Sequence, residues 1–191
     1  MTRIVCLCLS VVLGVGILLA ASNDASDHPQ YTGENRLLPP GNYREWIFLS
    51  SGLGMNYSAM AMGADMFTNV FVAPWAYQAF LKSGKWPDKT IFVVEERNAQ
   101  SKGSINKHGN FQTDLTGIGV EVKDEARFSE KWAYFNFDAD TKSAAPNPKQ
   151  ACWQCHEDHA AVEHSFTQFY PTLKPVAKKF GTYKESAEQV Q

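Results

Sequence analysis

Cysteine is scarce in this chain, with four residues in 191, and two of the four lie in a segment that is expected to be removed. Cys6 and Cys8 belong to a nearly unbroken apolar run over residues 4–21, which follows the single charge of Arg3. Because the run ends in small residues, we interpret residues 1–22 as a secretory signal peptide. The two cysteines that remain exclude a disulfide-rich scaffold.

Export through such a leader predicts a periplasmic protein. The apolar run is also just long enough to span a bilayer, so an uncleaved membrane anchor is the alternative. The chain lacks a basic patch, and its formal net charge is −2, which excludes nucleic acid as a partner. It also lacks internal repeats, and the remaining length of about 165–170 residues predicts one domain with a sizeable core.

The two remaining cysteines, Cys152 and Cys155, form a C-x-x-C-H motif with His156. This motif is typical of c-type haem attachment, in which two thiols one helical turn apart bond the haem vinyl groups and the histidine binds the iron. We therefore expect one covalently bound haem c, with His156 as its metal ligand. A thioredoxin-like dithiol does not need the histidine. A zinc site needs a second ligand pair, and His159 and His164 alone form a poor one.

The rest of the chain predicts an α+β fold, with a mostly antiparallel β-sheet and flanking helices in a single haem domain. Apolar and aromatic runs predict strands at the end of 43–51 and over 68–72, 90–97, 117–123 and 132–137. Helices are expected over 75–83, 124–131, 149–164 and 173–180, with Pro175 breaking the last one early. The polar segment 23–40 reads as a loose N-terminal arm, 41–181 as the haem domain and 182–191 as a C-terminal tail.

Several segments together resemble the cytochrome P-460 family, which includes the cytochromes c′-β. They are Tyr43-Arg44-Glu45-Trp46, Val70-Phe71-Val72, residues 80–88 (FLKSGKWPD), the C-x-x-C-H motif and residues 166–173 (FTQFYPTL). The resemblance implies a homodimer with one haem per chain, held by two thioethers and one axial histidine. It also implies that the other iron face is open to small ligands.

One departure from the family pattern separates its branches. Hydroxylamine-oxidising members carry a lysine cross-linked to the haem, and the matching position here is Val94, in a strand over 91–97 that has no lysine. The resemblance therefore favours the c′-β branch, which binds nitric oxide or related gases. Alternation places Phe92 and Glu96 on the face of Val94. We expect Phe92 and Val94 to line the open iron face, although Phe92 is equally suited to ordinary sheet core.

Two other functions stay open. A methionine as sixth ligand, with Met55, Met60, Met62 and Met66 as candidates, would make the protein a six-coordinate periplasmic electron carrier with a redox partner protein. A hydroxylamine-oxidising cytochrome is the other. The favoured prediction is a five-coordinate cytochrome whose partner is a small gaseous or nitrogen-oxide ligand.

Overall fold

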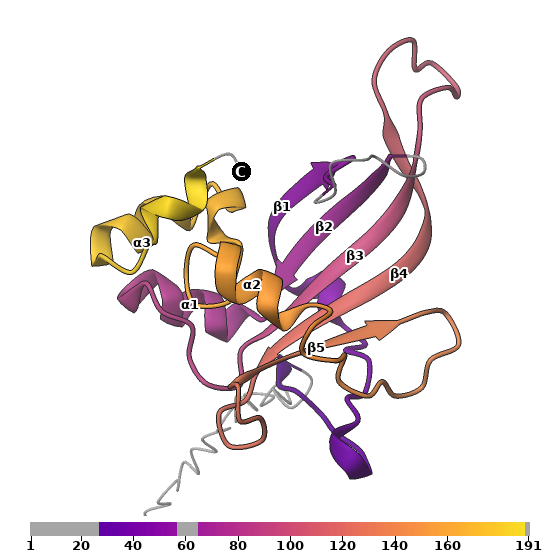
Figure 1. Ribbon diagram of the computed structural model, residues 1–191. Helices are drawn as coiled ribbons and strands as arrows, with labels where there is room; N and C mark the ends of the chain where they lie inside the picture. The colour runs from indigo at the N-terminus through magenta and orange to yellow at the C-terminus, as the bar shows by residue number, and fades with distance from the viewer. Residues whose placement is uncertain (1–26, 57–64, 190–191) are drawn as a thin grey trace, which may run out of the picture.

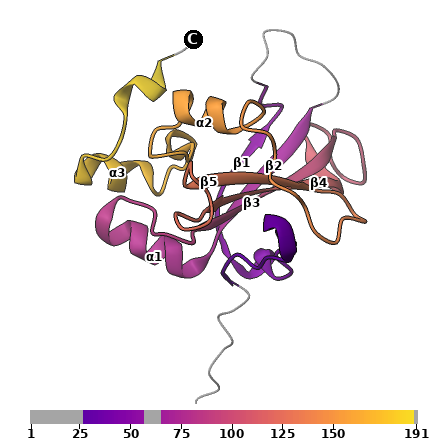
Figure 2. The ribbon, with the colours of Figure 1, turned by 60° about the horizontal axis from the view of Figure 1, so that its bottom comes forward.

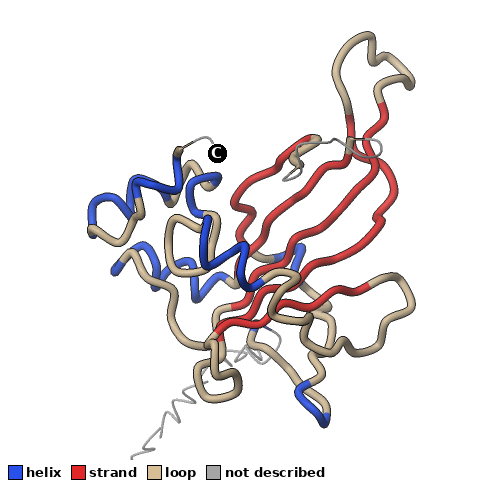
Figure 3. Tube along the Cα trace, viewed as in Figure 1, coloured by secondary structure: helices blue, strands red, loops and turns tan. Residues whose placement is uncertain are grey.

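The computed structural model describes residues 27–56 and 65–189, and a five-stranded antiparallel sheet lies at its centre (Figure 1). The strands are β1 (Ile47–Leu53), β2 (Met66–Val72), β3 (Ile91–Gln100), β4 (Phe111–Lys123) and β5 (Trp132–Phe137). Their order in the sheet is their order in the chain. Helices and long loops surround this sheet, as Figure 3 shows. The predicted α+β fold is confirmed.

The register of the strands defines two faces of the sheet. Val70 pairs with Val94, Val94 with Gly119, and Gly119 with Asn136. Residues that pair directly point to the same side, so these four lie on one face, which we call the inner face because the helices pack against it. The other side is the outer face. Alternation along β3 therefore places Phe92 and Val94 together on the inner face, as the sequence predicts.

Helix α2 (Trp153–His159) lies over the inner side of the sheet, and α1 (Pro74–Ser83) and α3 (Lys174–Phe180) lie together beside one end of it (Figure 2). Pro74 occupies the first turn of α1, where its missing N–H costs nothing. Gly84 ends α1 with φ of +66°, and an added Cβ there would lie 2.8 Å from the Cβ of Phe180. Gly84 therefore provides both the left-handed turn and the close approach of α3.

An aromatic core joins the helices to the inner face. Phe92 is fully buried, and its ring centroid lies 4.7 Å from that of Trp86, 6.3 Å from that of Trp132 and 6.4 Å from that of Tyr170. Phe80 of α1 lies on the other side of Trp86, with the two ring centroids 4.1 Å apart. These rings bury a large apolar area, which is the main favourable term in folding.

A buried carboxylate organises the outer face. Glu95 of β3 has a 4% exposed side chain and accepts hydrogen bonds from Tyr43 (2.9 Å), Arg44 (2.6 Å), Arg97 (2.9 Å) and Asn69 (3.2 Å). Burial alone raises the pKa of Glu95, but the bonds from Arg97, Arg44, Asn69 and Tyr43 outweigh it and lower the pKa to about 2. The network ties the segment before β1 to the centre of the sheet.

The N-terminal segment is not the loose arm that its composition predicts. Within 23–40, the residues from 27 onward are described, and Leu37 is fully buried. Leu37 exchanges two backbone hydrogen bonds of 2.9 Å with Ala144, in the segment that follows β5. In Figure 2 the described part of the arm lies on the side of the sheet opposite α2, which is the outer face, where Val93 and Val120 are buried.

The segment 182–191 is likewise packed where it is described. Thr182 donates a hydrogen bond of 2.6 Å to the carbonyl of Gly84, and the amide of Lys184 donates one of 2.8 Å to Ala161. A short 3-10 helix, η5 (Glu185–Glu188), follows. These contacts join the end of the chain to α1 and to the loop after α2.

Three predictions about helices are wrong. Residues 124–131 form turns, closed by the amide of Asp124 bonding Lys131 over 2.7 Å, instead of a helix. Helix α2 ends at His159 rather than at 164, because the next residue, Ala160, has an extended backbone with φ of −74° and ψ of 138°. Pro175 lies in the first turn of α3, so it starts this helix rather than breaking it. Among residues 27–56 and 65–189, no helix has the length and apolar character needed to cross a bilayer.

Candidate functional site

The two cysteines sit at the start of α2. Cys152 is the residue before the helix, and its carbonyl accepts a bond of 3.1 Å from the amide of His156, so one turn separates the motif's first and last residues. Both thiols are free and half-buried. Burial raises the pKa of the Cys155 thiol. The motif thus presents two free thiols on one helical turn, the spacing at which they can bond the two haem vinyl groups.

His156 is held in one orientation. Its Nδ1 lies 2.7 Å from the carbonyl oxygen of His164, and since a carbonyl only accepts, Nδ1 carries the proton. In a neutral imidazole with the proton on Nδ1, Nε2 keeps its lone pair, and this is the form of histidine that binds metals. The ring lies between Tyr134 and Phe166, with centroid distances of 4.4 and 4.3 Å, and the side chain is 12% exposed.

Strand β4 faces this histidine with an acid. Nε2 of His156 lies 3.8 Å from Oε1 of Glu121, and the other oxygen of Glu121, Oε2, is buried without a hydrogen-bond partner. Burial raises the pKa of Glu121, while the nearby His156 opposes this. A buried polar atom without a partner is costly and calls for a group that the chain itself does not supply.

Next to Glu121, the inner face of the sheet has little side-chain bulk. Gly117 and Gly119 occupy the two preceding inner positions of β4, and an added Cβ at Gly119 would lie 3.7 Å from the Cβ of Val94. Val94 and Val70 are half-buried here. The result is a small apolar area around Val94 and Val70 on which a flat group can lie, bordered by Glu96 and Asn136, on the same side of the sheet as α2.

The predicted site residues differ in their surroundings. Val94 lies on this apolar area, whereas Phe92 is enclosed by Trp86, Trp132 and Tyr170 and has no exposed surface. The contacts of Phe92 match the core interpretation that the sequence left open.

The alternative ligands that the structure describes are Met55, Met66, His159 and His164. Met55 and Met66 are 39% and 36% exposed, and Met60 and Met62 lie outside the described residues. The ring of His164 lies 4.8 Å from that of Trp153, and burial first, then His156, lowers its pKa to about 4. His159 ends α2, and its carbonyl accepts a bond of 2.9 Å from Gln168. Within the described ranges, no group of three or more His, Cys, Asp or Glu side chains is arranged to hold a metal ion.

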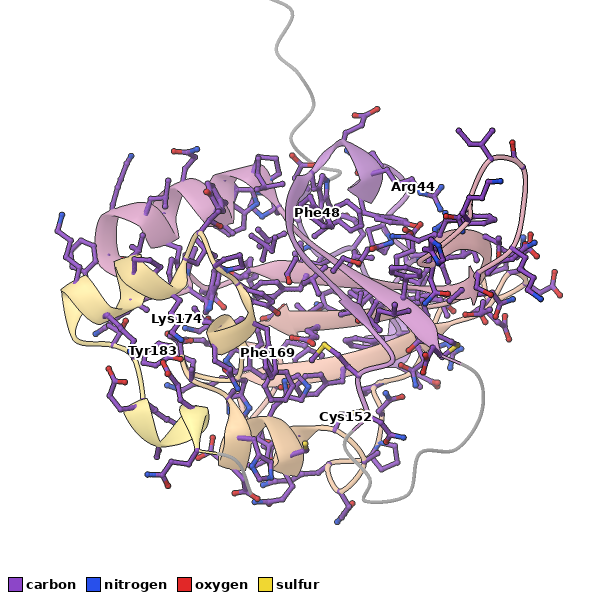
Figure 4. The ribbon with its side chains drawn as sticks, turned by 90° about the horizontal axis from the view of Figure 1, so that it is seen from above. Arg44, Phe48, Cys152, Phe169, Lys174 and Tyr183 are labelled. Carbon is purple, nitrogen blue, oxygen red and sulfur yellow. The ribbon has the colours of Figure 1, made fainter. Side chains whose placement is uncertain are left out.

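The residues present fit a haem. Two half-buried thiols, a histidine with its Nε2 free, two aromatic rings and an unpartnered buried carboxylate oxygen meet between α2 and the sheet. Sequence reasoning missed Glu121, Tyr134 and Phe166. The alternation of Gly117, Gly119 and Glu121 along β4 is the signal that could have identified the first. Figure 4 shows Cys152 and Phe169 on one side of the sheet and Arg44 and Phe48 on the other.

The comparisons with known proteins agree with this fit. The family model described as Cytochrome P460 matches residues 40–167, from the segment before β1 to the start of η4 (Thr167–Phe169). No curated protein matches the chain. The match covers more than half of the sequence and includes both thiols, His156 and the whole sheet, so the chain belongs to the cytochrome P460 family of haem-binding cytochromes.

Proposed function

We propose that this chain is an exported monohaem c-type cytochrome whose five-coordinate iron binds a small gaseous ligand such as nitric oxide. The observation that carries the proposal is the pair of free thiols beside a histidine whose Nδ1 is committed to the His164 carbonyl over 2.7 Å. Cys152 and Cys155 would bond the haem, and His156 would ligate it. When bound, the haem supplies the iron at which a diatomic gas coordinates.

The side chains near His156 support an open sixth position. Haem iron in proteins takes its protein ligands from His, Cys, Met or Tyr. The hydroxyl of Tyr134 is directed toward His164, whose Nδ1 is 3.4 Å away, and burial raises the pKa of this hydroxyl. The inner positions of β3 and β4 beside the histidine include Val94, Gly119 and Gly117. The side chains of Val94 and Val70 offer a charged ligand no hydrogen bonds, which favours uncharged gases over the apolar area.

The hydroxylamine-oxidising alternative receives less support. Strand β3 contains no lysine, and its one cationic side chain, Arg97, is bonded to Glu95 and to the carbonyl of Thr113. Lys89, just before the strand, pairs with Asp124. No amine of this strand is therefore available for a cross-link. The electron-carrier alternative needs a methionine ligand and a redox partner protein.

The attachment is tested on the mature holoprotein. Mass spectrometry is expected to show one haem bonded to a peptide containing Cys152 and Cys155, with residues 1–22 removed. The ferrous spectrum is expected to be high-spin and five-coordinate, and to change on addition of nitric oxide. A haem that acid-acetone extracts intact would contradict covalent attachment, and a low-spin ferrous spectrum before any gas is added would favour the electron carrier.

Two substitutions on the same face of β3 test the gas site. Val94→Phe fills the apolar area and is expected to slow gas binding to the ferrous protein by about tenfold, since roughly 1.4 kcal/mol of steric cost corresponds to that factor. Phe92→Leu lies in the enclosed core and is expected to cost about 1 kcal/mol of stability with unchanged gas rates. Stopped-flow or flash-photolysis rates and urea unfolding measure the two effects. Faster binding in Phe92→Leu would assign the capping role to Phe92.

The resemblance to this family also motivates two proposals on cellular context. We propose that the mature protein is periplasmic and a homodimer. Cell fractionation and light scattering of the purified holoprotein test them; a membrane-bound product would indicate an uncleaved leader.

A further inference from the structure

A tight turn places the carbonyl that orients His156. Val162 and Ser165 exchange two backbone hydrogen bonds, of 2.9 and 3.3 Å, and Glu163 and His164 form the turn between them. Glu163 has φ of +50°, a left-handed conformation that favours Gly, Asn or Asp over Glu. A glutamate in this position needs surrounding contacts to hold it. The carbonyl of the next residue, His164, is the one that His156 Nδ1 donates to over 2.7 Å.

Lys123 supplies such a contact. It lies at the end of β4, on the inner face, with a 9% exposed side chain. Its Nζ donates to Oε2 of Glu163 over 2.8 Å and to the carbonyl of Trp86, also over 2.8 Å. A buried ammonium is retained only with close partners. The pair therefore fixes the first residue of the turn to the rigid end of the sheet.

The residue after His164 is also anchored to Trp86. Ser165 is fully buried, and its Oγ accepts a hydrogen bond of 2.7 Å from Nε1 of Trp86. The same hydroxyl lies 2.7 Å from that of Thr167. The residues before and after His164 are thus both joined to Trp86, through Lys123 on one side and directly on the other. The His164 carbonyl sits between two anchored neighbours.

We propose that the Lys123–Glu163 ion pair is a positioning device for the axial ligand, which it controls through the carbonyl of His164. The proposal rests on the proposed function, in which His156 ligates the haem. A hydrogen bond from the second ring nitrogen fixes the orientation of a ligating histidine and raises its basicity. When the pair is lost, the turn relaxes, the His164 carbonyl moves, and His156 becomes a weaker ligand. Lys123 and Glu163 touch neither the iron nor a gas, so they are positioning residues.

Two substitutions remove opposite ends of the pair in the holoprotein. Lys123→Met removes the ammonium, and Glu163→Asn removes the carboxylate while keeping a residue that accepts a left-handed backbone. Both are expected to move the iron–histidine stretching band of the ferrous protein to lower frequency and to raise the midpoint potential. Loss of such supporting bonds changes metal affinity by about 10–100-fold in other sites. The double variant is expected to resemble the single ones, since the two side chains act as one unit.

Lys178→Met is the matched control. Its amine pairs with Glu185 over 2.9 Å on the exposed surface of α3, so its removal is expected to leave the band and the potential unchanged. Thermal unfolding of each variant separates stability from ligation. Lower stability with an unmoved band and potential would overturn the proposal. If Lys123→Met does not fold, the Glu163→Asn variant alone tests the proposal, because the Glu163 side chain is 28% exposed and its replacement disturbs the core less. A wild-type protein without an iron–histidine band would contradict the proposed function instead.

Discussion

Replacing Glu95 by alanine is expected to lower the free energy of unfolding by about 3–5 kcal/mol, the usual cost of removing one partner from a buried ion pair. The carboxylate is 4% exposed and accepts bonds from two arginines, a tyrosine and an asparagine. Without it, the hydroxyl of Tyr43 and the amide of Asn69 lose a buried partner. Urea unfolding at neutral pH measures the loss.

The same carboxylate predicts a pH dependence. Because the pKa of Glu95 is lowered to about 2 in the folded protein, below its ordinary value of 4.5, its contribution to stability is complete above pH 4.5. The contribution is lost as the pH falls from 4.5 toward 2. Over this window, Glu95→Gln is expected to lose less stability than the wild type. Glu45→Ala, on the exposed side of the short helix that carries Tyr43 and Arg44, is the control and should change stability by less than about 0.5 kcal/mol. Parallel pH profiles for wild type and Glu95→Gln would contradict the role of the network.

Replacing His156 by alanine is expected to abolish the iron–histidine stretching band of the ferrous protein, because the motif offers the iron one axial imidazole. Under the proposed attachment the haem should stay bound to the chain, since Cys152 and Cys155 would carry the covalent bonds. Added imidazole is expected to restore a histidine-like spectrum, because His156 is enclosed by Tyr134 and Phe166 and its removal leaves a ring-sized space. Resonance Raman and absorption spectra of the holoprotein measure both effects.

His159→Ala provides the control for this substitution. His159 lies on the same helix, one turn further on, and its carbonyl rather than its ring makes the contact with Gln168. Its removal is expected to leave the band in place. If His159→Ala abolishes the band while His156→Ala keeps it, the ligand assignment is wrong.

Sequence patterns predicted correctly those helices and strands that are determined by residues close together in the chain. Pro74 and Gly84 bracket α1 as expected, and the alternation along β3 placed Phe92 and Val94 on one face. The C-x-x-C-H spacing brings its three residues together because a single helical turn does so. Alternation along β4 places Glu121 on the same face as Gly117 and Gly119, but its approach to His156 depends on how α2 packs against the sheet, which no short window of sequence contains.

The wrong predictions for segments 23–40, 149–164 and 124–131 also concern structure that short sequence patterns do not determine. The segment before β1 is polar and rich in turn residues, yet Leu37 anchors it through a partner 107 positions along the chain, Ala144. The segment 149–164 carries helix-forming residues throughout, but the Val162–Ser165 turn and its tie to Trp86 end α2 early. Capping residues such as Asp124 favour turns and helix starts alike, so the predicted helix over 124–131 rested on a signal shared by both structures.

The order of the strands has a consequence for how the protein acquires its shape. Each strand pairs with the next one along the chain, so the sheet grows by successive hairpins, closes loops of modest length and has a low contact order for a β-rich domain. All five strands precede residue 149, while the thiols and the segment that encloses them follow. As the chain emerges N-terminus first, the sheet can therefore assemble while Cys152 and Cys155 are still outside it. The haem would then be attached when the sheet has formed but the segment that encloses the thiols has not. The contacts of residues 160–184 would form last.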